Sequence, residues 1–171
     1  MGRRAVIFGS AAAGALELEG GNGLPCYSAP VSRVMLVKEA TTLVPPTIHG
    51  PQSVAAALWP LVELFPVEMV FAVAVDARRK VLQVVRVSEG CLTSSIVHPR
   101  EFFRVALLSN AAGLIAVHNH PSGECQPSPE DHALTRRLRE AAEIMGIPLM
   151  DHLILGKRDS FFSYAEHAWP Q

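Results

Sequence analysis

Apolar and polar positions follow one another along the chain in blocks that predict short strands and amphipathic helices. Residues 68–75 form a β-rich run, and residues 81–87 alternate apolar and polar side chains. The polar segment 76–80 between them predicts a turn, so these two strands are expected to pair as a hairpin. Further strands are predicted at residues 31–37, 92–97, 114–117, 149–155 and 161–164.

Two helices are predicted from proline positions and helical spacing. The first begins near residue 51 and runs to residue 65, and Pro60 is expected to kink or split it. The second begins at Pro99, which suits the first helical position, and Gly113 is expected to end it. Its predicted apolar face consists of Phe103, Ala106, Leu107 and Asn110.

A third helix has capping residues at both ends. Ser128 is a good N-cap residue, and Asp131 stands at the position that completes a capping box. Gly146 is expected to end the helix. Its predicted apolar stripe consists of Leu134, Leu138, Ala141 and Met145.

The composition is that of a globular protein, with 49% hydrophobic and 18% charged residues. Residues 1–30 are rich in Gly and Ala and lack periodicity, so we expect a flexible tail there and a single α/β domain over residues 31–171. A surface that binds phosphate backbones is usually clearly basic, whereas the formal net charge is -1. Nucleic acid is therefore the second choice of partner.

Cysteines and apolar runs indicate the cellular setting. The three cysteines lie far apart and form no CxxC pair, which is typical of a reducing cytosol. No apolar run reaches the roughly 18 residues that span a bilayer, so no membrane partner is expected. The N-terminal segment is similar to a short signal peptide, and export through it is the alternative to a cytoplasmic location.

Two histidines and one aspartate carry the candidate chemistry. His118 and His120 are two residues apart at the end of a predicted strand, so both imidazoles are expected to point the same way. A turn-rich loop then brings Asp131 back on the first turn of the third helix. Two nitrogen ligands and one carboxylate leave a fourth tetrahedral position open, which is typical of a catalytic zinc ion.

Such a zinc ion lowers the pKa of bound water to about 7 and so supplies hydroxide at neutral pH. Efficient hydrolysis also needs a general base and a donor for the developing oxyanion. Ser128 is placed to be the donor, although capping the helix explains its presence equally. Composition alone does not identify the base.

The pattern His118-x-His120-Pro121 followed by Ser128-x-x-Asp131 resembles the JAMM motif of MPN-type zinc metalloproteases. The fuller string HNHPSGECQPSPED, with its flanking segments, is more similar to the RadC-like branch of that superfamily. The resemblance covers roughly residues 31–166. It implies a cytidine-deaminase-like MPN/JAMM architecture, an α+β arrangement in which helices flank a central mixed sheet.

The same resemblance implies a role for each site residue. His118, His120 and Asp131 would be the ligands of one zinc ion, and Ser128 would assist the tetrahedral intermediate. The family's general base is an upstream glutamate, which should fall at Glu68, with Glu63 as the competitor.

The resemblance implies hydrolysis of a peptide or isopeptide bond in a peptide or protein substrate. The alternatives are a DNA-associated accessory factor without peptidase activity and a scaffold that keeps the metal. Longer RadC-like proteins carry a helix-hairpin-helix region, for which no room is expected before residue 31. Asn119 replaces the Ser or Thr of deubiquitinating relatives, which weakens the case for ubiquitin-like substrates. His152 receives no role, and Cys125 is interpreted as incidental.

Overall fold

The computed structural model describes residues 18–19, 25–26, 47–62, 66–90 and 97–170. The chain divides into two units, Met1–Val34 and Met35–Gln171. In the first unit, strands β1 (Leu18–Glu19) and β2 (Pro25–Cys26) pair antiparallel. The predicted strand at 31–37, residues 92–96 of another, and the predicted helix end at 63–65 lie outside the described residues.

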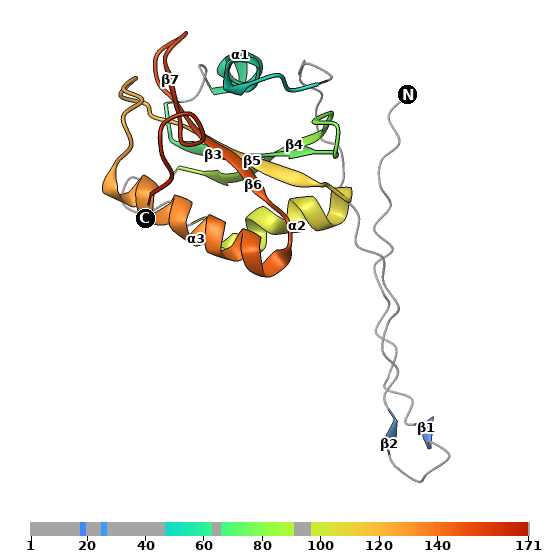
Figure 1. Ribbon diagram of the computed structural model, residues 1–171. Helices are drawn as coiled ribbons and strands as arrows, with labels where there is room; N and C mark the ends of the chain where they lie inside the picture. The colour runs from blue at the N-terminus through green and yellow to red at the C-terminus, as the bar shows by residue number, and fades with distance from the viewer. Residues whose placement is uncertain (1–17, 20–24, 27–46, 63–65, 91–96, 171) are drawn as a thin grey trace, which may run out of the picture. The chain divides into compact units, whose positions relative to one another are not determined.

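A mixed sheet of five strands forms the centre of the second unit, in the order β4-β3-β5-β6-β7 (Figure 1). Strands β5 and β6 are parallel, and the other neighbours are antiparallel. The predicted hairpin of β3 and β4 is confirmed. The strands are β3 (Met69–Val75), β4 (Val81–Glu89), β5 (Gly113–Asn119), β6 (Leu149–Leu155) and β7 (Phe161–Ser163).

Helices cover both faces of this sheet (Figure 1). Helix α1 (Pro51–Val62) lies on one face, and α2 (Pro99–Ser109) and α3 (Pro129–Met145) lie on the other. Residues of β3 therefore contact α1 and the α2–α3 layer in alternation, and every residue of β3 and β5 is buried. The predicted α/β class and the central mixed sheet flanked by helices are confirmed, and the arrangement is consistent with the JAB/MPN fold.

Helix α2 ends earlier than predicted. Asn110 is its C-cap in the left-handed region, with φ 50°, and the backbone N–H of Asn110 donates to Ala106. Asn tolerates that conformation, so the helix does not need Gly113 to end it. Gly113 instead begins β5, where a Cβ atom would come within 2.8 Å of the Met150 sulfur. Leu107 is 57% exposed, so it was wrongly placed on the buried face.

Helix α3 has the predicted caps, with a complete capping box at Ser128 and Gly146 at its end. Its buried face, however, differs from the predicted apolar stripe, because Met145 is exposed and two polar residues are buried instead. The buried residues are Asp131, Thr135, Leu138 and Ala142. Asp131 and Thr135 therefore face a polar cluster, while Leu134 and Ala141 of the predicted stripe are partly buried against the hydrophobic core around Leu138.

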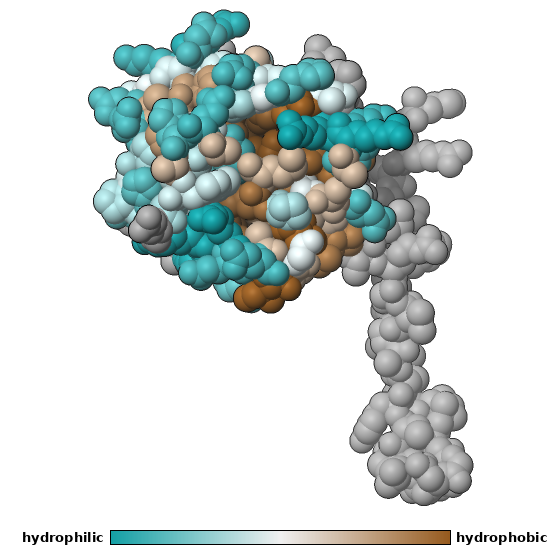
Figure 2. Space-filling model, in the orientation of Figure 1, coloured by the Kyte–Doolittle hydropathy of each residue, from teal (hydrophilic) through white to brown (hydrophobic). Residues whose placement is uncertain are grey.

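Helix α1 runs as one helix through Pro60, which was expected to kink or split it. Pro60 lies in the last turn of the helix, where it removes one backbone donor and only two helical residues follow it. Hydrophilic side chains surround a limited apolar area on the face shown in Figure 2. In the described part of the chain, no helix has the length and hydrophobicity that crossing a membrane requires.

Candidate metal centre

His118 and His120 meet at the end of strand β5. His118 is fully buried and pairs with Val70 of β3, so its side chain faces the α2–α3 layer. His120 follows the strand, and its backbone N–H donates to the carbonyl of Leu155 over 2.9 Å. The Nδ1 atom of His120 lies 2.8 Å from the carbonyl oxygen of Glu124. These contacts turn its Nε2 to within 3.1 Å of the His118 Nε2, so the predicted common direction is observed.

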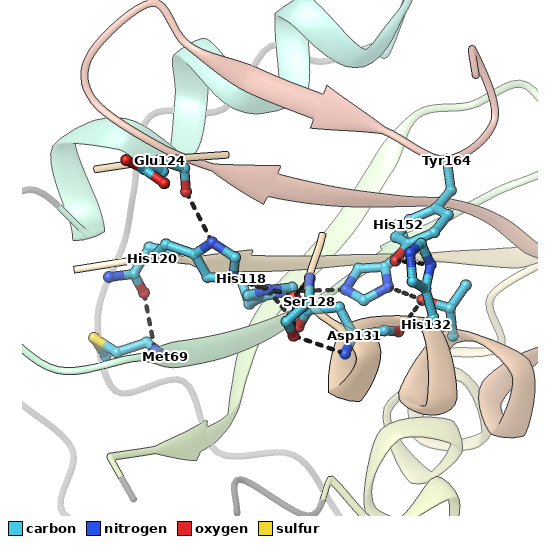
Figure 3. A network of polar contacts seen from close by, with 11 residues as sticks. Met69, His118, His120, Glu124, Ser128, Asp131, His132, His152 and Tyr164 are labelled. Carbon is cyan, nitrogen blue, oxygen red and sulfur yellow. Dashed lines mark hydrogen bonds and ion pairs between the residues drawn. The ribbon is translucent and has the colours of Figure 1, made fainter. Parts of the chain in front are cut away.

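Asp131 approaches the two imidazoles from the first turn of α3 (Figure 3). Its Oδ1 lies 3.0 Å from the His118 Nε2, and its Oδ2 lies 3.3 Å from the His120 Nε2. The backbone N–H and the hydroxyl of Ser128 both donate to Oδ2, over 2.8 and 2.7 Å. The capping box that begins the helix therefore also aims the carboxylate at the histidines.

The three side chains form a group that could hold a metal ion, because one ligand atom from each lies within 4.8 Å of the others. Two imidazole nitrogens and one carboxylate oxygen are donors that zinc accepts, and they leave one tetrahedral position to another ligand. The donor set therefore fits a zinc ion. Cys125 is not in the group, and its Sγ accepts a hydrogen bond from the Ser160 hydroxyl over 3.2 Å.

The electrostatics of the group also suit a cation. Burial alone would raise the pKa of Asp131, but hydrogen bonds from His118 and His120 outweigh it and hold this pKa well below its usual value. The carboxyl is therefore ionised. The pKa of His120 is raised, chiefly by its hydrogen bond to Asp131 and next by its bond to the Glu124 carbonyl, and the charges of Asp131 and Glu68 add smaller shares.

Glu68 precedes β3, where the sequence analysis expected the base, and its charge acts on the site through His120. The side chain of Asn119 holds the backbone on both sides of Glu68. Its Oδ1 accepts from the Met69 N–H over 2.9 Å, and its Nδ2 donates to the Val67 carbonyl over 3.1 Å. Glu63, the competitor, lies outside the described residues.

His152 lies directly behind the metal group, although the sequence analysis gave it no role. Its Nε2 is 2.9 Å from the His118 Nδ1, and its Nδ1 is 2.7 Å from the Thr135 Oγ1. The ring of Tyr164 stacks on it at 5.3 Å. Burial, and then the nearby charge of His118, hold the pKa of His152 well below its usual value. The parallel pairing of β5 and β6 would have revealed this contact, but the sequence alone does not fix that register.

Comparison with known proteins adds the family context. A family model described as the RadC-like JAB domain matches residues 48–169. A UPF0758 protein of Desulforudis audaxviator is 42% identical over 155 residues, which cover 88% of this chain and 67% of that protein.

Two further UPF0758 proteins match smaller parts of their own length. The protein of Trichlorobacter lovleyi is 48% identical over 58% of this chain and 43% of its own length. The protein of Burkholderia cenocepacia is 40% identical over 81% of this chain and 53% of its own length. The chain thus spans only part of these relatives.

Proposed function

Because the chain belongs to the RadC-like JAB domain family, we propose that it is a zinc-dependent hydrolase of peptide or isopeptide bonds. His118, His120 and Asp131 would hold one zinc ion. The observation that carries the proposal is the convergence of these three side chains from a strand end and a helix start, with one ligand atom from each inside 4.8 Å. A zinc ion held there would supply a water molecule whose pKa is lowered to about 7.

Glu68 is proposed as the general base. It would take a proton from the attacking water and later pass it to the leaving amine. Two observations support this role: the negative charge of Glu68 is near enough to add a small share to the raised pKa of His120, and Asn119 bonds to the backbone on either side of Glu68. A base must stay within hydrogen-bond reach of the proton that it moves, so a fixed backbone at this position is useful.

Ser128 is proposed to stabilise the developing oxyanion. Its hydroxyl now donates to the Asp131 Oδ2, and it also accepts from the Asp131 N–H. Rotation about the Cβ–Oγ bond would redirect the hydroxyl hydrogen toward a substrate oxygen without moving the backbone. The cap and the oxyanion donor are then two uses of one side chain.

Zinc content and cleavage of a peptide library test the proposal together. We expect one zinc ion per wild-type chain, loss of that zinc in His118→Ala, and loss of cleavage with retained zinc in Glu68→Gln. The control is Glu143→Gln, which changes an exposed glutamate of α3. Cleavage by Glu68→Gln at the wild-type rate would exclude Glu68 as the base, and a wild-type chain without zinc would refute the metal site.

A DNA-associated role is the alternative, and a gel-shift assay across a salt series separates it from the hydrolase. Attraction to phosphates is largest at low salt, so the absence of binding there would dismiss it.

A further inference from the structure

A buried chain of hydrogen bonds leads from His118 into the protein, away from the metal group. It runs from the His118 Nδ1 to His152, from His152 to the Thr135 hydroxyl, and from that hydroxyl to the backbone carbonyl of Asp131. The three distances are 2.9, 2.7 and 2.6 Å. His118, His152 and Thr135 are each 0% exposed, so no bulk water competes for these bonds.

The carbonyl of Asp131 fixes the direction of every bond in this chain. A carbonyl oxygen only accepts, so the Thr135 hydroxyl must use its one hydrogen there. The hydroxyl oxygen then accepts from the His152 Nδ1–H. A neutral imidazole carries one N–H, so the His152 Nε2 is an acceptor and the His118 Nδ1 must be the donor. Within the described residues no carboxylate bonds to the His152 ring, and the ring is fully buried, which favours its neutral form.

The direction of these hydrogen bonds determines which ring nitrogen of His118 carries a proton. Its Nδ1 donates to His152 and keeps its proton, so Nε2, which bonds to Asp131 in this structure, is the nitrogen that a metal ion would take. The same Nε2 is the one that faces His120 and Asp131. The assignment begins at a backbone carbonyl of α3, so it does not presuppose a metal.

We propose that His152 and Thr135 are positioning residues that hold His118 with its Nδ1 protonated and its Nε2 directed at the metal site. This inference rests on the metal site of the proposed function. Ligand histidines usually donate their second N–H to a carboxylate, a carbonyl or water, and loss of such a partner lowers metal affinity roughly 10- to 100-fold. In this protein the imidazole of His152 accepts the second N–H of His118, and the Thr135 hydroxyl sets the tautomer of His152.

This series of hydrogen bonds also connects two of the proposed metal ligands, His118 and Asp131, which come from different secondary-structure elements. Asp131 offers its side chain to the metal group and its backbone carbonyl to Thr135, one turn further along α3. His118 belongs to β5, and His152 belongs to the parallel neighbour β6. A shift of α3 along the sheet would therefore disturb the tautomer of His118 as well as the position of the carboxylate.

A pair of variants at Thr135 isolates the hydroxyl. Thr135→Val keeps the shape of the side chain and removes the hydroxyl, whereas Thr135→Ser keeps the hydroxyl. Without it, His152 can carry its proton on Nε2 and oppose the Nδ1–H of His118. We expect zinc affinity, measured by competition with a chromophoric chelator at fixed pH, to fall roughly 10- to 100-fold in Thr135→Val and to stay within about threefold in Thr135→Ser.

Nitrogen-15 NMR of the imidazole rings gives a readout that a merely structural role would not move. In the metal-free wild-type chain we expect a proton on Nδ1 of both His118 and His152, and we expect the His118 Nδ1 proton to remain after zinc is added. An unprotonated Nδ1 on His118, or a proton on the His152 Nε2, would overturn the proposal even if every variant failed to fold.

A core control separates tautomer control from general loss of stability. Leu138→Ala opens a cavity beside the same helix and removes none of these hydrogen bonds, so zinc affinity should stay within about threefold of wild type. Equal affinities for Thr135→Val and Thr135→Ser would overturn the positioning role while leaving the metal site intact. Failure of the wild-type chain itself to bind zinc would instead refute the proposed function.

Discussion

Replacing Asn119 by Leu tests how the base is held. Leucine has the branched outline of asparagine, with two methyl groups in place of the amide oxygen and nitrogen, so it makes neither the bond to the Met69 N–H nor the bond to the Val67 carbonyl. Met69 is 1% exposed, so its N–H would remain buried and unpaired, at a cost of about 1–3 kcal/mol. The half-buried Val67 carbonyl can reach water, and its lost bond costs about 1 kcal/mol.

The sum is a loss of about 2–4 kcal/mol in the free energy of unfolding, which is large enough to measure by urea denaturation. For a chain of this size, it lowers the melting temperature by roughly 5–15 °C. Zinc affinity should stay within about threefold, because the Asn119 side chain bonds to no residue of the metal group. Turnover of a library-selected peptide should fall roughly 100-fold, because the base is no longer held within reach of its proton.

Val73→Ala is the matched control, since it removes buried apolar contacts of the same strand on the face covered by α1. It should lower stability by a similar amount and leave turnover at saturating zinc unchanged. If Asn119→Leu lost stability but kept wild-type turnover, the side chain would not be holding the base. If it lost zinc affinity in proportion to turnover, Asn119 would act through the ligands of β5.

Three further predictions follow from the same contacts. Ser128→Ala should lower the free energy of unfolding by about 1 kcal/mol in urea denaturation, and Ser128→Thr should recover most of it; equal losses would show that the hydroxyl cap is not stabilising. Removing zinc from the loaded wild-type chain with a chelator should lower its melting temperature. If free zinc stood at 100 times its dissociation constant, the free energy of unfolding should fall by about 2.7 kcal/mol. An unchanged melting temperature would count against zinc binding. Burial raises the pKa of Asp151 above its ordinary value of 3.8, despite hydrogen bonds from Ser163, Ala165 and His152. A carboxyl with a raised folded pKa stabilises the fold below its unfolded pKa and loses that contribution as pH rises through the folded pKa. Asp151→Asn should therefore gain stability relative to wild type as pH rises above about 4, and a difference that is constant from pH 4 to 8 would contradict this.

Much of the candidate site was predictable because its signals are local. Asp131 is the capping partner of Ser128, as their spacing of three residues predicted. It is also a member of the metal group, as the loop after the two histidines and the resemblance to the JAMM motif predicted. His118 and His120 were expected to point the same way from strand geometry. In the structure His120 lies just after the strand, and its bonds to Leu155 and Glu124 turn it inward.

Other features depend on contacts that are distant in sequence, and the sequence analysis missed them. The role of His152 depends on the register of the parallel pair β5–β6, which places Ala116 opposite it and His118 two residues further on. The burial of Thr135 depends on which face of α3 meets the sheet. The apolar pattern favoured a stripe through Met145, because a polar residue that is buried for its hydrogen bonds does not register as hydrophobic.

The helix ends show a third case, in which two residues carry the same local signal. Asn110 and Gly113 can both adopt the left-handed conformation that ends a helix, and Asn110 is the one that does so. Gly113 instead begins β5, where a Cβ atom would lie 2.8 Å from the Met150 sulfur, so a larger residue there would displace that side chain. Local preference alone does not tell the two residues apart.

Crystallography of the zinc-soaked full chain, with anomalous diffraction recorded at the zinc absorption edge, would locate the metal ion itself. We expect one anomalous peak per chain, within about 2.0–2.2 Å of the His118 Nε2, the His120 Nε2 and a carboxylate oxygen of Asp131, with a fourth ligand that is not from the protein. A peak at other residues, a fourth ligand from the protein, or no peak at saturating zinc would contradict it.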